Sequence, residues 1–275
     1  MFDCELVGKI GSMALIRENE HDIDYNVFSR IGSELSPGTI WISSGAVEIG
    51  RIDYMKRNDG NEIDHHIKEE LNASYAAQGQ TILMENYRKF INPSYSVRQV
   101  LVEHQHFNQP EKARFIRNLL LDCTKQKAIP IVNYNDSISN EETRKMELLD
   151  LNKKQEKVVE CIDNDETASE IATLVKSKYL LILTSSIGLL KDAKDPNSLI
   201  NEVNGKDIYE LLENINELKS CCVGASRKGA NGMQAKLEYI SEPIKNGTTV
   251  IIGHSKYRIR DLIQGNVERT IFKIK

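Results

Sequence analysis

Short apolar runs recur along the chain and are separated by longer amphipathic stretches. The runs have the length of buried strands and lie at residues 5–10, 39–43, 97–102, 128–132, 179–184, 248–252 and 270–274. Between them, apolar residues recur at helical spacing at residues 25–35, 67–90, 110–125, 167–176, 208–218 and 233–245, and a further helix begins near residue 47. This alternation predicts an α/β fold whose mostly parallel central sheet is covered by helices on both faces.

One segment, residues 137–159, does not fit the alternation. It mixes charged and apolar residues and contains no glycine. We expect it to lie outside the sheet, as a helical excursion, a flap over the site or a contact between subunits. No linker rich in Pro, Gly or Ser and no internal repeat divides the chain, so residues 1–275 are expected to form a single domain.

The composition narrows the classes of function. With 40% apolar residues the chain can bury a sizeable core, and its formal net charge of -4 gives no basic field for nucleic acid. No apolar stretch is long enough for a membrane span, and the N-terminus does not resemble a signal peptide. The five cysteines show no metal-ligand spacing, which is typical of reduced thiols. We therefore expect a cytoplasmic protein that binds neither membranes nor nucleic acid.

Polar residues follow three of the predicted strands directly. They are Ser43-Ser44, Asn135-Asp136 and Thr184-Ser185. In open parallel sheets, ligands bind at the carboxyl ends of the strands. These three strand ends are therefore expected to converge on one binding edge.

Two helix starts carry candidate chemistry. Ser44-Gly45 joins a strand to a helix, and such a turn can bind an anion through unpaired backbone N–H groups; the alternative is an ordinary serine cap. Asp163 and Asp165 flank Asn164 where a loop becomes a helix, and they offer carboxylates to a metal, an ammonium or a lysine. The alternative there is that Asn164 or Asp165 caps the helix.

Glycine-rich turns with lysines suggest a phosphate site. Residues 224–232 are glycine-rich and basic, and Lys236 follows near the start of a helix. Backbone dipoles and positive charge together suit a polyphosphate. Lys9 precedes another glycine turn and could also reach a phosphate, although a solvated lysine at a strand end is the alternative.

Two further groups of residues favour structural roles. Ala73, Ala76 and Gly79 share a long helix, and small residues there indicate close packing against a neighbouring element. The histidines have no cysteine or carboxylate partners at metal-ligand spacing, so we expect surface histidines rather than a metal site. They are His65, His66, His104 and His106.

Seven motifs, taken in order, resemble the amino acid kinase family, and most of all its glutamate 5-kinase branch. They are VGKIGS, SSGAVEIG, AAQGQ, IPIVNYND, DNDETASEIATLV, LLILTSSIGLL and GANGMQAKL, and the resemblance covers residues 5–272. It implies a three-layer αβα sandwich that binds the phosphoryl acceptor in its N-terminal half and ATP in its C-terminal half. It also implies a short form without the PUA domain that many bacterial members carry.

The resemblance assigns roles position by position. Lys9 and Lys236 resemble the two lysines that neutralise the transferring phosphoryl group, and Asp165 resembles the aspartate that holds them. Substrate-binding positions are matched by Ser44, Gly45, Asp136 and Asn164. Nucleotide-binding positions are matched by Lys9, Thr184, Ser185, Ala230, Asn231, Gly232, Met233 and Lys236. Magnesium would come with ATP and bridge its oxygens, without a metal site of the protein's own.

The activity implied is ATP-dependent phosphorylation of the side-chain carboxylate of L-glutamate, the first step of proline biosynthesis. A homo-oligomer that binds a small amino acid and ATP is expected. A kinase of another small acid, or a non-catalytic relative that binds an amino acid or nucleotide, stays open. The reason is that Ser185, Leu190 and residues 229–232 depart from the family's nucleotide-binding pattern.

Overall fold

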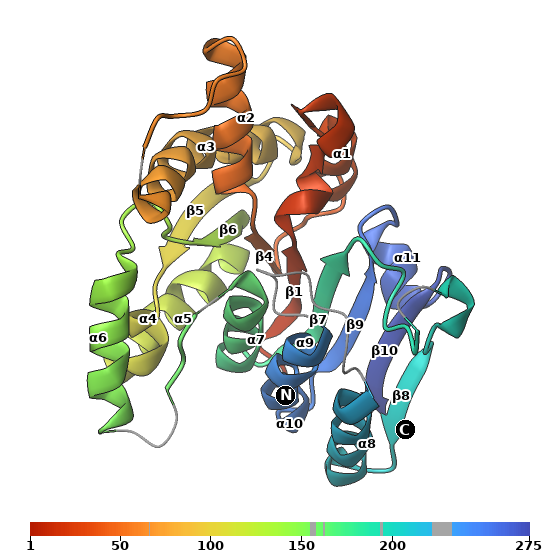
Figure 1. Ribbon diagram of the computed structural model, residues 1–275. Helices are drawn as coiled ribbons and strands as arrows, with labels where there is room; N and C mark the ends of the chain where they lie inside the picture. The colour runs from red at the N-terminus through yellow and green to blue at the C-terminus, as the bar shows by residue number, and fades with distance from the viewer. Residues whose placement is uncertain (66, 155–157, 162, 193–194, 222–232) are drawn as a thin grey trace.

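An eight-stranded sheet between two layers of helices forms the body of the protein in the computed structural model (Figure 1), which describes residues 1–65, 67–154, 158–161, 163–192, 195–221 and 233–275. In space the strands are ordered β5-β6-β4-β1-β7-β9-β10-β8. Their bounds are β1 Cys4–Ile10, β4 Thr39–Ser43, β5 Ser96–Val102, β6 Ala128–Tyr134, β7 Ser177–Thr184, β8 Glu202–Gly205, β9 Thr249–His254 and β10 Arg269–Ile274. Only β9 and β10 pair antiparallel among these neighbours, so the predicted mostly parallel α/β sandwich is confirmed.

Strand β1 lies at the centre of the sheet and defines the binding edge. It pairs in parallel with β4 on one side and with β7 on the other, and Ile10 is in register with both Ser43 and Leu183. The three strands therefore end at the same level. Connections leave this point in opposite directions, which opens a crevice of the kind where α/β proteins bind ligands.

Helices pack on the two faces of the sheet over separate apolar clusters. One cluster takes residues from α1 (Tyr25–Gly32), α2 (Ala46–Arg57), α3 (Lys68–Phe90) and α11 (Ile259–Gln264). The other takes residues from α5 (Pro110–Lys125), α7 (Asn164–Leu174), α8 (Ile208–Cys221), α9 (Met233–Tyr239) and α10 (Ser241–Lys245). Because side chains alternate along a strand, Val7 of β1 joins the second cluster while Leu6 and Ile10 join the first. Lys9, two residues after Val7, lies on the α7 side.

Two glycines let α2 and α3 approach each other through their backbones. A Cβ added at Gly79 would lie 1.8 Å from the carbonyl oxygen of Ala46, and one at Gly50 would lie 1.9 Å from that of Tyr75. Only glycine fits at such a distance. The close packing predicted at Gly79 is confirmed, and it fixes the start of α2 next to the end of β4.

The remaining elements lie outside the large sheet. They are the strands β2 (Ile16–Arg17) and β3 (Asp22–Ile23), the helices α4 (Gln105–Asn108) and α6 (Glu141–Asn152), and short 3-10 turns at Ser12–Leu15, Glu18–Glu20 and Pro196–Ser198. Helix α6 forms most of the segment 137–159 and stands at the side of the molecule in Figure 1. Its Leu148 is buried, and Glu147 Oε2 lies 3.0 Å from Nε2 of His104 in the body of the protein. The predicted helical excursion is therefore confirmed.

Several details differ from the expectations. The stretch 233–245 forms two helices, because the chain turns at Ile240 and Pro243 in α10 has no N–H for a continuous ladder. The short elements β2, β3, β8 and α11 were not predicted. Among the described residues, no helix is long and apolar enough to cross a membrane.

Candidate active site

Two lysines from distant parts of the chain meet one aspartate at the binding edge. Lys9 Nζ lies 2.7 Å from Asp165 Oδ1, and Lys236 Nζ lies 2.5 Å from Asp165 Oδ2. Lys9 comes from β1, Asp165 from the first turn of α7, and Lys236 from α9. We call these three residues the Lys-Asp-Lys cluster. Lys9 is only 8% exposed, so the alternative of a solvated strand-end lysine is wrong.

The charges in this cluster do not cancel. Burial alone would raise the pKa of Asp165, but the nearby Lys9 and Lys236 outweigh it and hold the pKa below its ordinary value. Asp165 is 4% exposed and stays ionised between the two ammonium groups. One net positive charge is therefore left in a region with little water, where it attracts a polyanion strongly.

The start of α7 is built so that its polar side chains remain available. Asp163 is the cap, because its Oδ1 accepts the N–H groups of Asp165 at 2.8 Å and Glu166 at 3.0 Å. The alternative that Asn164 or Asp165 serves as the cap is wrong. Both side chains are free to face the binding edge, one toward the lysines and the other toward β4.

Asn164 links α7 to the ends of β4 and β6. Its Nδ2 donates to Ser44 Oγ at 3.0 Å and to Asn133 Oδ1 at 2.9 Å. Asn133 Oδ1 also accepts the N–H of Tyr134 at 2.9 Å, which fixes the orientation of both amides. The other end of the Asn164 amide, Oδ1, is buried and has no hydrogen-bond partner in the described part of the chain. A buried acceptor of this kind is ready for a ligand that donates hydrogen bonds.

The turn at Ser44-Gly45 leaves the start of α2 open. Gly45 is the N-cap residue and adopts φ 110°, and among the described residues no side chain caps this helix. The alternative of a serine cap is therefore wrong. The Ser44 N–H donates to the carbonyl of Ile10 at 3.1 Å, which ties the turn to the end of β1. The first N–H groups of α2 therefore remain available to an anion beside Asn164.

Asp136 reaches the same edge but not the same network. It lies beyond the end of β6 and is half-buried, and burial raises the pKa of its carboxyl to about 6 although Arg144 acts in the opposite direction. In the residues described, no hydrogen bond joins Asp136 to Ser44 or Asn164. Because its carboxylate is poorly solvated, a cationic group placed nearby would stabilise the ionised form.

The nucleotide-binding residues are only partly placed. Thr184 ends β7, and its hydroxyl accepts the Ser186 N–H at 2.9 Å and donates to the Ser186 carbonyl at 3.0 Å, so it stabilises its own turn. Ser185 beside it is exposed. Met233 is the first residue of α9, whereas Ala230, Asn231 and Gly232 lie outside the described residues. All of the nucleotide assignments stay predictions, including those of Lys9 and Lys236, for which the structure shows the contacts to Asp165.

In the described ranges, no three His, Cys, Asp or Glu side chains come together as a metal site. His104 is only 3% exposed, so the prediction of a surface histidine is wrong at this position. Its Nε2 lies 3.0 Å from Glu147 Oε2 of α6.

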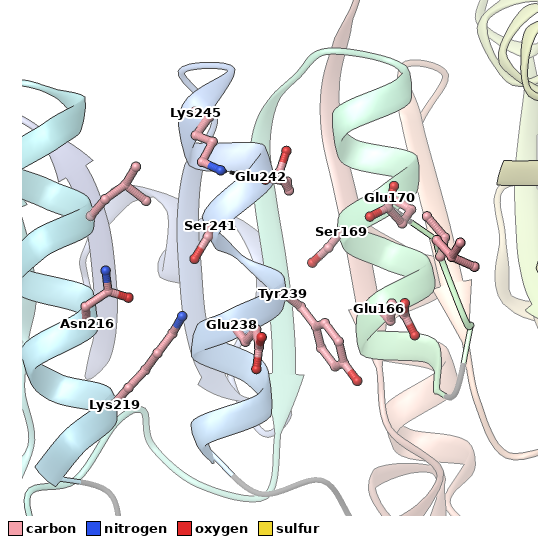
Figure 2. A pocket seen from close by; sticks show the side chains of 13 residues that line it. Glu166, Ser169, Glu170, Asn216, Lys219, Glu238, Tyr239, Ser241, Glu242 and Lys245 are labelled. Carbon is pink, nitrogen blue, oxygen red and sulfur yellow. Dashed lines mark hydrogen bonds and ion pairs between the residues drawn. The ribbon is translucent and has the colours of Figure 1, made fainter. Parts of the chain in front are cut away.

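A hollow of about 430 Å³ lies on the α7 side of the sheet, between α7, α8 and the pair α9 and α10 (Figure 2). Its lining includes Glu166, Ser169 and Tyr239. Ser169 Oγ is buried and has no hydrogen-bond partner among the described residues. Although Glu166 is adjacent in sequence to Asp165, the lining contains no residue of the Lys-Asp-Lys cluster. The hollow is thus distinct from the binding edge.

Two features that support the site were not predicted from the sequence. Asn133, 1% exposed, orients Asn164, and its only signal was its place at the end of a buried strand. Behind Ser44, a buried chain of hydrogen bonds runs from Trp41 Nε1 to the Tyr87 hydroxyl at 2.9 Å, and from that hydroxyl to Ser43 Oγ at 2.8 Å. No spacing in the sequence indicates this pairing, because Tyr87 lies on α3.

Comparisons with known proteins find relatives that match nearly the whole chain. A glutamate 5-kinase of Clostridium perfringens is 28% identical over 279 residues, covering 98% of this chain and 95% of the relative. One of Enterococcus faecalis is 26% identical, covering 97% and 93%. A solved carbamate kinase from Giardia lamblia bound to AMP-PNP superposes with a TM-score of 0.61 at 16% identity, covering 98% of both chains, and shows the shared fold.

The family match covers most of the chain. The model of the amino acid kinase family matches residues 6–254, a span that contains the Lys-Asp-Lys cluster and the turn at Ser44-Gly45. The chain therefore belongs to the amino acid kinase family.

Proposed function

We propose that this protein transfers the γ-phosphoryl group of ATP to the side-chain carboxylate of L-glutamate. The observation that carries the proposal is the pairing of Asp165 with both Lys9 and Lys236, which leaves one net positive charge at the carboxyl edge of the sheet. The names of the relatives support the choice of acceptor.

On the phosphoryl side, the cluster supplies fixed positive charge. Negative charge spreads over the oxygens of the transferring group, and little proton transfer has to be arranged. Lys9 and Lys236 lie on opposite oxygens of one carboxylate, so Asp165 sets their spacing before ATP arrives. Charge that is already in position lowers the barrier without reorganisation. Magnesium would arrive with the nucleotide and offset charge on its phosphates.

On the acceptor side, three groups together fit a zwitterion. The open start of α2 can hold a carboxylate through its N–H groups. Asn164 Oδ1 offers a free acceptor, and the carboxylate of Asp136 offers a negative charge to an α-ammonium group. Glutamate carries both kinds of group, and its second carboxylate is left for the reaction. Synthesis of glutamyl phosphate in the cytoplasm, for the proline pathway, is the role we propose.

A panel of acceptors tests the proposal. Purified protein, ATP and Mg²⁺ are incubated with glutamate, glutarate, aspartate, N-acetylglutamate or carbamate, and acyl phosphate is trapped with hydroxylamine. We expect the highest kcat/KM with glutamate. Glutarate should react poorly because it lacks the amino group and would leave Asp136 and Asn164 unpaired.

The panel separates the competing functions. Turnover with another acid at a higher kcat/KM would replace glutamate as the acceptor while keeping the kinase assignment. No turnover with any acid, combined with calorimetric binding of an amino acid or nucleotide, would favour a non-catalytic relative. An alanine variant of the exposed Lys245 serves as the control for each assay, since its ammonium group pairs with the nearby Glu242 at 2.7 Å and with no other carboxylate in the described part of the chain.

A further inference from the structure

Helix α6 presents an apolar surface that none of the described residues covers. Met146 is 70% exposed and Leu149 is 62% exposed. On the opposite side of the helix, Leu148 is buried and Arg144 and Leu151 are half-buried. The helix is thus held on the body by one side, while two large apolar side chains face outward from the other.

These outward residues form part of a regular stripe. Successive residues of an α-helix are separated by about 100°, so Glu142, Met146, Leu149 and Lys153 project in nearly one direction. All four are exposed. The stripe reads acidic, apolar, apolar, basic along the chain, with Lys153 as the C-cap residue of α6. We call these four residues the α6 stripe.

The order of charges in the α6 stripe is complementary to itself in one orientation only. When two copies of α6 pack antiparallel, Met146 meets Leu149 of the other copy and Glu142 meets Lys153, and both contacts occur twice about the two-fold axis. A parallel arrangement would place Glu142 against Glu142 and Lys153 against Lys153. Isologous two-fold contacts of this kind are the commonest interfaces of homo-oligomers.

We infer that a second copy of this chain binds here, with the two α6 helices antiparallel about a two-fold axis. The inference does not depend on the proposed catalytic function. A helix of 12 residues is only about 18 Å long, and a helix pair of this length buries less surface than a stable dimer needs. The contact is therefore concentration-dependent, or it joins subunits that also associate elsewhere.

Lys153 pairs with Asp150 within its own helix at 3.0 Å, and this does not oppose the contact. Both side chains are largely exposed, and exposed ion pairs of this type contribute little to stability. Lys153 can therefore turn to Glu142 of the second copy at small cost. The two apolar side chains, which are largely exposed, provide the driving force.

Charge reversal gives a sharp test. Glu142→Lys places lysine against Lys153 twice in a homodimer, and Lys153→Glu places glutamate against Glu142 twice. We expect each variant alone to associate with itself roughly tenfold more weakly than the unmodified protein. When the two variants are mixed, every contact between them is again between opposite charges, so they should form a heterodimer. The double variant should self-associate as the unmodified protein does.

The measurement is sedimentation velocity across the micromolar to submillimolar range, with one variant fluorescently labelled for the mixing experiment. Lys154→Glu is the matched control for Lys153→Glu, because it makes the same change from positive to negative charge at a residue outside the α6 stripe. It should associate as the unmodified protein does. Circular dichroism checks that α6 and the fold persist. Equal association of the unmodified protein and both single variants at all concentrations, or a mixture that sediments as the sum of its parts, overturns the inference.

Discussion

The side-chain amide of Asn164 donates to Ser44 Oγ at 3.0 Å, although the two residues are 120 positions apart in sequence. This bond joins the first turn of α7 to the strand-helix turn after β4. The next residue of α7, Asp165, pairs with both lysines of the Lys-Asp-Lys cluster. One helix turn therefore sets the positions of the acceptor side and of the phosphoryl side relative to each other.

The first prediction concerns the cluster itself. Lys9→Ala and Lys236→Ala should each lower kcat by on the order of 10²-fold or more, because each removes charge felt most strongly in the transition state. Asp165→Asn should have a similar effect since the lysines lose their shared anchor. Steady-state kinetics, with Lys245→Ala as the control, measure the change. Near-normal turnover in a folded variant would remove that residue from the catalytic set.

A second prediction separates binding from capping within one turn of α7. Asn164→Asp keeps the size of the side chain but replaces the donor to Ser44 and Asn133 with an acceptor, so KM for the acceptor should rise strongly. Asp163→Ala should instead lower the free energy of unfolding by about 1 kcal/mol through loss of the cap. Kinetics and urea denaturation of both variants test this. A larger KM effect in the cap variant would contradict it.

The raised pKa of Asp136 predicts that kcat/KM for glutamate depends on pH. Burial raises the pKa of its carboxyl from 3.8 to about 6, so protonation below pH 6 removes the anion that would pair with an ammonium group. The value of kcat/KM for glutamate should fall below about pH 6, and Asp136→Asn should be slow at every pH and lose this limb of the profile. An unchanged profile in the asparagine variant would exclude Asp136 as the titrating group.

The same shift has a consequence for stability with a definite sign. The folded pKa lies above the unfolded one, so the folded state binds the proton more tightly and loses stability as the pH rises through about 6. Asp136→Asn should therefore raise the melting temperature at pH 8 but change it little below pH 4. A lower melting temperature of the variant at pH 8 would show that the carboxylate has a favourable partner.

The contact between α2 and α3 predicts a large effect from one methyl group. Gly79→Ala should lower the free energy of unfolding by about 3 kcal/mol, because the new Cβ would lie 1.8 Å from the carbonyl oxygen of Ala46 and the helices must separate. The exposed Ala77→Ser, on the same helix, is the control. Equal melting curves for Gly79→Ala and the unmodified protein would mean that the helices separate at no cost.

Much of this fold could be predicted because its signals are local. The bounds of α5, residues 110–125, were predicted correctly since Pro110 sits at the first helical turn, where its missing N–H costs nothing. The hairpin of β2 and β3 escaped prediction because two-residue strands have no periodicity.

The site was harder to predict, because it depends on contacts between distant segments. The residues Asp163, Asn164 and Asp165 are all good caps, and only the folded turn distinguishes them. The roles of Asn133 and Tyr87 arise entirely from such contacts.

The central position of β1 has a consequence for synthesis of the chain. Its neighbour β4 is made early, but its other neighbour, β7, begins only at Ser177. Until then β1 is an edge strand with its β7 side unpaired, and its apolar residues are covered only in part. Exposed edges of this kind pair readily with other chains. The nascent N-terminal half therefore presents an open strand edge to other chains until β7 has been made.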